Sequence, residues 1–237
     1  MLFIAEIGLN HDGNFDLAYE MIKQAKLAGA DIAKFQFGWR NKPDEINFID
    51  KKRAEELKAW CQYWDIEIMA SIITEEALEL AHHIEPKRYK IASRTVIDKP
   101  KLCEQILSEG KETFVSLGMW DKNEFPFGKP DSEKLRYIYC RSKYPCYPED
   151  MTELPEQFDP ENGYYGYSDH LHGIEGCLLA IARGAQFIEK HFTLNRTSKV
   201  IRDHVLSATP PEFRQLTELG RPLSKLVKVV NSDKSIR

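Results

Sequence analysis

Residues 164–192 read YYGYSDHLHGIEGCLLAIARGAQFIEKHF and contain two short strand-like runs separated by a helical segment. The first run ends in GYSDHLHG, residues 166–173, and the second is FIEKHF, residues 187–192. A strand, a helix and a second strand in this order predict a parallel pair with a right-handed connection. Both runs end in polar residues and a histidine, where glycine, asparagine or proline would normally stop a strand. These two strand ends therefore suit a binding site better than a turn.

The same alternation of strands and connecting segments continues along the whole chain. The strand-like runs are LFIAEIG, DIAKFQF, IEIMASI, YKIAS, TFVSLG, LRYIYC, YYGYSD and QFIEKHF. Eight such units in 237 residues predict an α/β fold, a single-domain (β/α)8 TIM barrel, which typically takes about 250 residues. An open doubly wound sheet is the competing fold, but no GxGxxG turn follows the first strand to favour it.

Composition and charge narrow the classes of function. The net charge is -4, from 33 Lys+Arg against 37 Asp+Glu, which gives no electrostatic argument for a nucleic acid or an anionic membrane as partner. The five cysteines contain no CxxC pair, so we expect a reduced, cytoplasmic protein without a disulfide framework. Cys140 and Cys177 fall on apolar segments and are interpreted as structural. The first residues do not resemble a signal peptide, and no run of about 18 apolar residues occurs.

Lysines and hydroxyl side chains gather at the predicted carboxyl ends of the strands, where β/α barrels place their active sites. Lys34, Lys90 and Lys190 belong to the second, fourth and eighth runs, and serines end most of the others. Because side chains alternate along a strand, Lys34 and Gln36 share a face. One lysine at a strand end is more often solvated, but three that converge predict a cationic cup for phosphate and carboxylate.

Two histidines at the ends of the quoted strands suggest a metal site. His170 and His191 end neighbouring strands, near Asp169 and Asp203, and Glu189 shares the face of His191. Imidazole and carboxylate groups in this arrangement suit a divalent ion with open coordination positions. The alternative for His170 alone is a satisfied polar residue without a ligand.

Eight runs, in order along nearly the whole chain, form a more specific pattern than any single strand end. They are AEIGLNHDGN, KFQ, YKIAS, SLGM, YPCYPED, GYSDHLHGIEG, IEKHFTLN and DHVLSATPPEF. Together they resemble the sialic acid synthase family, the phosphoenolpyruvate-condensing synthases of N-acetylneuraminate, legionaminate and pseudaminate. The catalytic domain of that family is a β/α barrel, which agrees with the strand count.

The resemblance implies a metal-dependent condensation of phosphoenolpyruvate with an open-chain aldose, which gives a sialic-acid-like α-keto acid and phosphate by C–O cleavage. Phosphoenolpyruvate would be held by Lys34, Lys90, Ser93, Ser116, Ser142, Ser168 and Lys190. The residues that would face the acceptor sugar and carry catalysis are Glu6, Gln36, Tyr144, Glu189 and Asp203. His170 and His191 would hold Mn²⁺ or Mg²⁺. Either Glu6 or Glu189 would transfer protons, and the sequence leaves this choice open.

The sequence departs from the family pattern in three respects. The family usually carries a C-terminal antifreeze-like domain, and we expect residues 1–237 to form one barrel domain without it. The segment FGWRNKPDEINFID, residues 37–50, is shorter than its family counterpart. The motifs IASRT, CRSKYP and IRDH differ from the family and place Arg94, Arg141 and Arg202 near the predicted mouth. We therefore expect an acceptor that differs from N-acetylmannosamine, with an acidic group that these arginines bind.

Two other interpretations stay open. One is a degenerate barrel that binds phosphoenolpyruvate or metal without catalysis, but retained lysines and histidines argue against it, because unused buried charges cost stability. The other is a different metal-dependent aldolase or lyase, for which no Schiff-base lysine is compelling. The expected partners are phosphoenolpyruvate and a sugar acceptor, with neither nucleic acid nor membrane, and a homodimer is left open.

Overall fold

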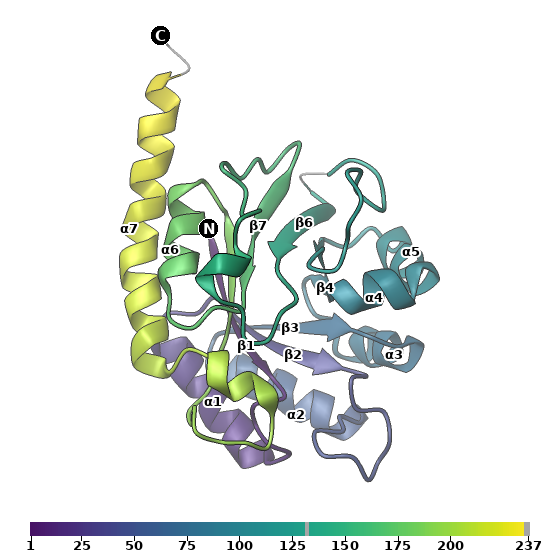
Figure 1. The fold of residues 1–237 in the computed structure, drawn as a ribbon. Coiled ribbons are helices and arrows are strands. Elements are labelled where there is room, and N and C mark those ends of the chain that lie inside the picture. Colours follow the sequence, from purple (N-terminus) through teal and green to yellow (C-terminus); the bar gives the residue numbers. More distant parts are fainter. Residues whose placement is uncertain (131–132, 235–237) are drawn as a thin grey trace.

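The computed structural model describes residues 1–130 and 133–234, and its strands close into a barrel. Eight parallel strands follow one another in chain order around the barrel, and β8 closes it by pairing with β1 (Figure 1). The strands are β1 (Leu2–Gly8), β2 (Ile32–Phe37), β3 (Glu67–Ile72), β4 (Tyr89–Ile91), β5 (Thr113–Ser116), β6 (Leu135–Cys140), β7 (Tyr164–Asp169) and β8 (Phe187–His191). The predicted (β/α)8 barrel is confirmed, and the open doubly wound sheet is excluded.

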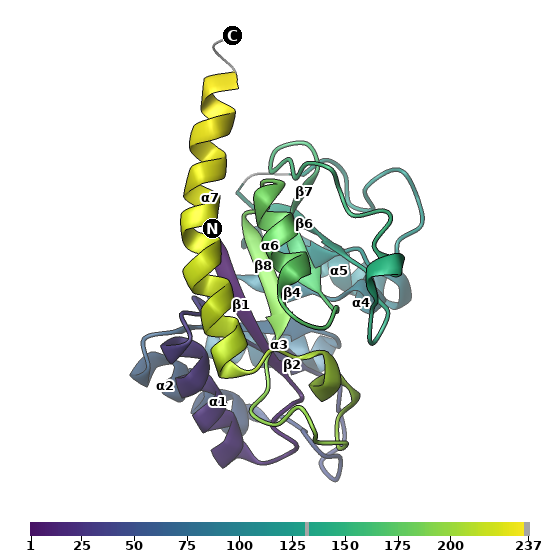
Figure 2. The same ribbon diagram turned by 60° about the vertical axis from the view of Figure 1, so that its left-hand side comes forward.

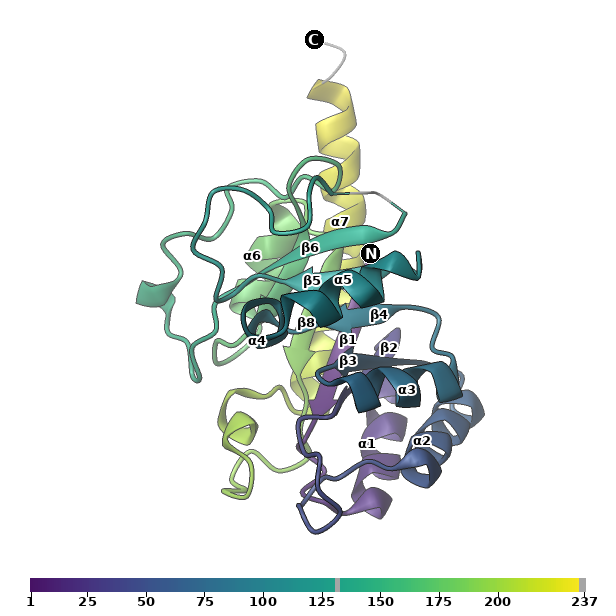
Figure 3. The same cartoon turned by 90° about the vertical axis from the view of Figure 1, so that its right-hand side faces the viewer.

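Helices cover the outside of the barrel unevenly. They are α1 (Phe15–Leu27), α2 (Lys51–Tyr63), α3 (Glu75–Ile84), α4 (Ser93–Asp98), α5 (Pro100–Ser108), α6 (Glu175–Ala182) and α7 (Pro210–Lys234). Between β5 and β6 the described residues form no helix, and between β6 and β7 they form only the 3₁₀ turn η1 (Pro148–Asp150). Figure 3 shows the loops of these two connections on the side away from α1 and α2. The Pro- and Gly-rich sequence of both connections accounts for the missing helices.

The last helix, α7, packs against α6 and α1 and extends well past the body of the barrel (Figures 1 and 2). A second 3₁₀ turn, η2 (Arg202–Leu206), lies in the loop that leads from β8 into α7. Neither α7 nor any other helix in the described ranges has both the length and the apolar character that a membrane span requires.

The interior of the barrel has an apolar floor. It is made by Ile4, Ile32, Met69, Phe114, Ile138 and Phe187, all fully buried. On β7 the corresponding position is Gly166, where a Cβ atom would collide with the backbone of Phe187. This floor fills the amino-terminal half of the barrel with side chains, as barrels of this size require. Any cavity must therefore open at the carboxyl ends of the strands.

Candidate active site

Polar side chains line the barrel directly above the apolar floor. Because side chains alternate along a strand, the residue two positions after each floor residue points inward again. These next inward positions are Glu6, Lys34, Ser71, Lys90, Ser116, Cys140, Ser168 and Glu189, and they line a cavity of about 460 Å³. One further step along the strands adds Gln36, Ala92, Ser142, His170 and His191 to its wall, and Ser93, Tyr144 and Asp203 line it from the loops. The structure thus brings together all the predicted site residues except Lys190.

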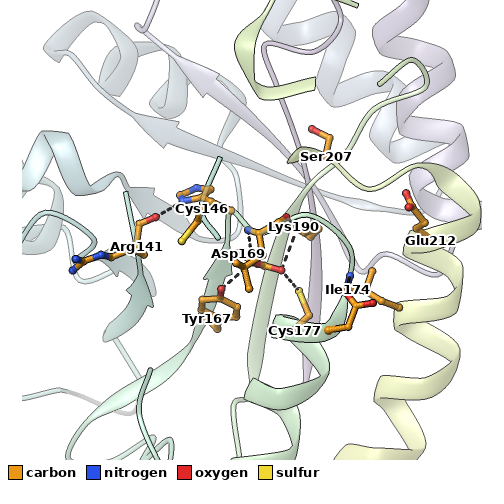
Figure 4. Close-up of polar contacts among 12 residues, drawn as sticks. Arg141, Cys146, Tyr167, Asp169, Ile174, Cys177, Lys190, Ser207 and Glu212 are labelled. Carbon is orange, nitrogen blue, oxygen red and sulfur yellow. Dashed lines mark hydrogen bonds and ion pairs between the residues drawn. The ribbon is translucent and has the colours of Figure 1, made fainter. Parts of the chain in front are cut away.

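Lys190 lies on the opposite face of β8. It stands between Glu189 and His191, so its side chain points away from the cavity. Its Nζ lies 3.2 Å from Asp169 Oδ2 and also donates to the backbone oxygen of Leu171 (Figure 4). The prediction that Lys190 holds phosphoenolpyruvate is wrong, because the strand period turns it toward the helix layer. The cationic cup therefore contains two of the three expected lysines, Lys34 and Lys90.

Lys34 is shared between two carboxylates at the base of the cavity. Its Nζ lies 2.7 Å from Glu6 Oε2 and 3.5 Å from Glu189 Oε2, and it donates to Ser71 Oγ at 3.0 Å. Burial on its own would lower the pKa of Lys34, but Glu189 and Glu6 outweigh it and raise that pKa. Lys34 is therefore a permanent cation.

Lys90 is less fully neutralised. Its Nζ donates to Ser116 Oγ at 2.7 Å, but its distance to the carboxylate of Glu189 is 3.8 Å. Burial lowers the pKa of Lys90 despite the attraction of Glu189. A buried cation with a distant counter-charge favours an added anion, which would restore its pKa and balance its charge.

The two carboxylates, Glu6 and Glu189, titrate in opposite directions. Burial raises the pKa of Glu6, and Lys34 offsets this only in part. Burial would also raise the pKa of Glu189, but Lys34, Lys90 and a hydrogen bond from Ser168 Oγ at 2.8 Å lower it to about 2. Two neighbouring carboxyl groups with separated pKa values are typical of sites that assign one to proton transfer and one to charge stabilisation.

His170 and His191 face each other with their ring centres 5.4 Å apart. His170 Nδ1 lies 2.7 Å from the backbone oxygen of Arg141, which can only accept, so Nδ1 carries a hydrogen and Nε2 is the ring nitrogen left for a ligand. Burial lowers the pKa of His191, although Asp203, 4.0 Å from its Nδ1, opposes this, so the ring is neutral near pH 7. Two imidazoles side by side in a polar cavity fit a divalent metal ion.

The carboxylates expected near the histidines contribute less to such a site. Asp203 lines the cavity, but Asp169 points to the other face of β7, toward Lys190. In the described ranges, no three His, Cys, Asp or Glu side chains come close enough together to form a metal-binding cluster. An ion held by the two histidines would thus keep coordination positions for substrate oxygens.

Cys140 belongs to the site, contrary to its interpretation as structural. It lines the cavity, and its Sγ lies 3.6 Å from His170 Nδ1. Burial alone would raise the pKa of this thiol, but His170 outweighs it and lowers the pKa. The two residues are 30 positions apart, and the parallel pairing of β6 with β7 brings them together. Cys177 is buried as expected, and burial together with Asp169 raises its pKa.

The three arginines predicted at the mouth differ in position. Arg94 and Arg202 line the cavity, and the guanidinium of Arg202 stacks 4.2 Å from the ring centre of Tyr144. Arg141 does not line it, since its side chain is exposed and pairs with Glu153 at 3.2 Å. Trp39 and Arg40, which follow β2 in the segment 37–50, line the rim and were not predicted. The signal for them is their place two and three residues past a strand end.

Comparison with known proteins agrees with this geometry. The model of the NeuB family matches residues 43–231. This chain belongs to the NeuB family. It is 31% identical over 264 residues to N-acetylneuraminate-9-phosphate synthase of Mus musculus, which covers 94% of this chain and 72% of the mouse protein. It is also 30% identical over 253 residues to N,N'-diacetyllegionaminic acid synthase of Legionella pneumophila, over 91% of this chain and 70% of that protein.

A solved structure in the same group, N-acetylneuraminic acid synthetase from Leptospira borgpetersenii, superposes with a TM-score of 0.81 at 30% identity. The match covers 95% of this NeuB-family chain and 84% of the Leptospira chain. The resemblance to the sialic acid synthase family is confirmed. The chain is accordingly a phosphoenolpyruvate-dependent synthase of the NeuB family, whose members condense phosphoenolpyruvate with a sugar.

Proposed function

We propose that this protein condenses phosphoenolpyruvate with an open-chain aldose in a metal-dependent reaction, and releases a sialic-acid-like α-keto acid and inorganic phosphate. The observation that carries this proposal is the composition of the cavity above the barrel floor. It combines two buried lysines, two carboxyl groups with opposite pKa shifts and two neighbouring histidines within about 460 Å³. Each group matches one requirement of this reaction.

Phosphoenolpyruvate would bind to the lysines and serines around the cavity wall. They are Lys34, Lys90, Ser93, Ser116, Ser142 and Ser168. The weakly compensated charge of Lys90 supports placement of an anionic group beside it, where Ser116 Oγ is already within 2.7 Å. Charge-assisted hydrogen bonds of this kind are about twice as strong as neutral ones and would fix the substrate's orientation.

His170 and His191 would hold the divalent ion, Mn²⁺ or Mg²⁺, through ring nitrogens that face the cavity. When bound, the ion supplies Lewis-acid polarisation of the acceptor's aldehyde oxygen. The hydrogen bond from His170 Nδ1 to the backbone of Arg141 fixes the ring orientation in advance.

In the proposed reaction, the methylene carbon of phosphoenolpyruvate attacks the aldehyde carbon of the acceptor. Positive charge then develops at C2 of the former phosphoenolpyruvate, water adds there, and phosphate leaves with its bridging oxygen. The aldehyde oxygen gains one proton, and the added water loses two, the second of which leaves with the phosphate. Glu6 is assigned to proton transfer, because burial raises its pKa and makes its protonated form easier to reach than that of Glu189. Glu189, with a pKa of about 2, stays anionic and stabilises the positive charge at C2.

A direct test measures phosphate release from phosphoenolpyruvate with Mn²⁺ across a panel of aldoses, aldose phosphates and N-acetylhexosamines. We expect release that depends on one class of aldose and that disappears on chelation and in His191→Ala. Inactivation by borohydride would instead indicate a Schiff-base aldolase. Binding of Mn²⁺ and phosphoenolpyruvate in calorimetry, without release for any acceptor, would indicate the non-catalytic barrel.

The rim supports a narrower proposal, that the acceptor carries a phosphate or carboxylate group. Arg40, Arg94 and Arg202 surround the mouth; the first two are loosely paired, at 3.8 and 3.7 Å from a carboxylate, and Arg202 donates to Asp203 Oδ1 at 3.3 Å. Arginine is well suited to grip such a planar or multidentate anion. The mouse relative is named as a 9-phosphate synthase, which is in line with a phosphorylated acceptor.

The test compares an acidic acceptor with its neutral parent in Arg94→Gln and Arg202→Gln variants. We expect kcat/KM to fall about 10-fold or more per arginine for the acidic acceptor, and to change little for the neutral one. Arg141→Gln is the matched control, since that arginine lies outside the cavity. Equal effects of all three substitutions would contradict the proposal.

We also propose a cytoplasmic location and leave a homodimer as a proposal for light scattering to test. All five cysteines are free and buried, which supports a reducing compartment.

A further inference from the structure

Asp169 and Lys190 form a fully buried ion pair directly behind the cavity, on the outer face of β7 and β8 (Figure 4). Both side chains are 0% exposed, and Lys190 Nζ lies 3.2 Å from Asp169 Oδ2. A buried pair of this kind repays its desolvation poorly, and apolar residues of similar size would often be at least as stable. Its presence therefore calls for a role in geometry rather than in stability.

Asp169 uses both carboxylate oxygens to fix the chain around His170. Its Oδ1 accepts from Tyr167 Oη and from the backbone N–H of Leu171, both at 2.8 Å. Its Oδ2 accepts from Cys177 Sγ at 3.1 Å and from Lys190. These bonds hold residues on both sides of His170, so that the turn after β7 has little freedom.

Lys190 connects this turn to the neighbouring strand. Asp169 and Lys190 are register partners in the parallel pairing of β7 with β8. Lys190 Nζ also donates to the backbone oxygen of Leu171, beyond the end of β7. Each member of the pair immediately precedes one of the two cavity histidines, His170 and His191. The pair consequently ties together the two backbone segments that carry these imidazoles.

We propose that Asp169 and Lys190 are positioning residues that fix the separation and orientation of His170 and His191, and thereby set the affinity for a divalent ion. Neither side chain touches the cavity, so the effect acts only through the histidines. The inference rests on the proposed function insofar as these histidines are taken as the metal-binding groups. Partners behind metal-binding imidazoles typically affect metal affinity by about 10- to 100-fold.

A buried arginine at the other end of the barrel serves as a control that distinguishes a positioning role from a contribution to stability. Arg88, 7% exposed, lies 2.7 Å from Glu67 and 3.1 Å from Glu112 near the amino ends of β3, β4 and β5. Its loss leaves the partly buried carboxylate of Glu67 without Arg88, while Glu112 keeps Arg136, and both lie far from the histidines in the barrel. A purely structural role for Asp169 and Lys190 predicts equal behaviour of both pairs.

The experiment titrates Mn²⁺ into the purified protein without substrates, with calorimetry and the electron paramagnetic resonance signal of free Mn²⁺ as readouts. The variants are Asp169→Asn, Lys190→Met and, as control, Arg88→Met, each with its unfolding temperature measured. We expect the Mn²⁺ Kd to rise about 10- to 100-fold in the first two variants and to stay within about twofold of wild type in Arg88→Met. Should Asp169→Asn or Lys190→Met not fold, Tyr167→Phe removes a single bond to Asp169 and should raise the Kd about threefold.

Variants of the two histidines show whether a negative result contradicts this inference alone or the proposed function as well. If His170→Ala and His191→Ala abolish Mn²⁺ binding while Asp169→Asn, Lys190→Met and Tyr167→Phe bind as wild type does, the positioning role is wrong and the proposed function stands. If wild type binds no Mn²⁺, or the histidine variants bind it normally, both are overturned.

Discussion

The two ends of the barrel both bury charged side chains, but they balance those charges differently. At the amino end, Arg88 lies between Glu67 and Glu112 at 2.7 and 3.1 Å, and Arg136 pairs with Glu112 at 2.7 Å. Each cation there has a carboxylate at hydrogen-bond distance. At the carboxyl end, Lys90 has its nearest carboxylate, that of Glu189, at 3.8 Å.

At the carboxyl end, the pKa values of like ionisable groups also shift in opposite directions. Lys34 has a raised pKa and Lys90 a lowered one, while Glu6 has a raised pKa and Glu189 a pKa of about 2. Buried charge with a close counter-charge is costly to break apart, whereas buried charge that is left poorly matched is typical of a functional site. The comparison indicates that an anionic group is missing beside Lys90, where the substrate would supply it.

Removing Lys90 should have the largest effect on function. In Lys90→Met we expect kcat/KM for phosphoenolpyruvate to fall about 1000-fold, because a buried charge that grips the substrate anion is lost. The free energy of unfolding should change by less than about 1 kcal/mol, since a poorly compensated buried charge is removed at the same time. Steady-state kinetics measures the change in kcat/KM, and denaturant unfolding measures the change in the free energy of unfolding. A large loss of stability in Lys90→Met would contradict the proposed difference between the two ends of the barrel.

Removing Arg88 should give the reverse result. In Arg88→Met the buried cation between two partly buried carboxylates is lost, Glu112 keeps only Arg136, and we expect the free energy of unfolding to fall by about 3 kcal/mol. The kcat/KM of the folded protein at 25 °C should stay within about twofold of wild type, since the apolar floor separates this end from the cavity. Urea unfolding curves and kinetics well below the transition test this. A 10-fold loss of kcat/KM would mean that the amino end also shapes the site.

A smaller effect should appear as a pH dependence of stability at the carboxyl end. His11, after β1, is fully buried beside the rings of Phe15 and Phe35, and burial lowers its pKa from 6.5 to about 4. Between these pH values the unfolded chain binds a proton that the folded chain does not, so stability falls as the pH drops from about 6.5 to 4. We expect His11 to contribute about 1 kcal/mol per pH unit in this range.

Unfolding free energies of wild type and His11→Leu at several pH values measure this contribution. The slope below pH 6.5 should be shallower in His11→Leu, whatever its absolute stability. His82→Gln, which changes an exposed histidine on α3, is the control and should keep the wild-type slope. Identical slopes in wild type and His11→Leu would show that His11 is protonated in the folded protein or is less buried than described.

Sequence alone predicted the barrel because the strand and helix periods are local. It also predicted most of the cavity, since inward positions recur every two residues from Ile4 to Glu6 or from Ile32 to Lys34. The same rule excludes Lys190 once Glu189 and His191 are placed inward, but the presence of lysines at three strand ends was given more weight than their facing. The contact of Cys140 with His170 depends on the register between β6 and β7, and the different positions of Arg141 and Arg202 depend on loop paths. Neither leaves a local pattern in the sequence.

The central claim is that the cavity at the carboxyl end condenses phosphoenolpyruvate with an aldose by C–O cleavage. The most direct test uses phosphoenolpyruvate labelled with oxygen-18 in the oxygen that bridges C2 and phosphorus, incubated with Mn²⁺ and the aldose panel. Mass spectrometry then locates the label. The account predicts labelled phosphate, released only with an acceptor and absent in His191→Ala. Label retained in the organic product, or no acceptor-dependent release of phosphate, would contradict it.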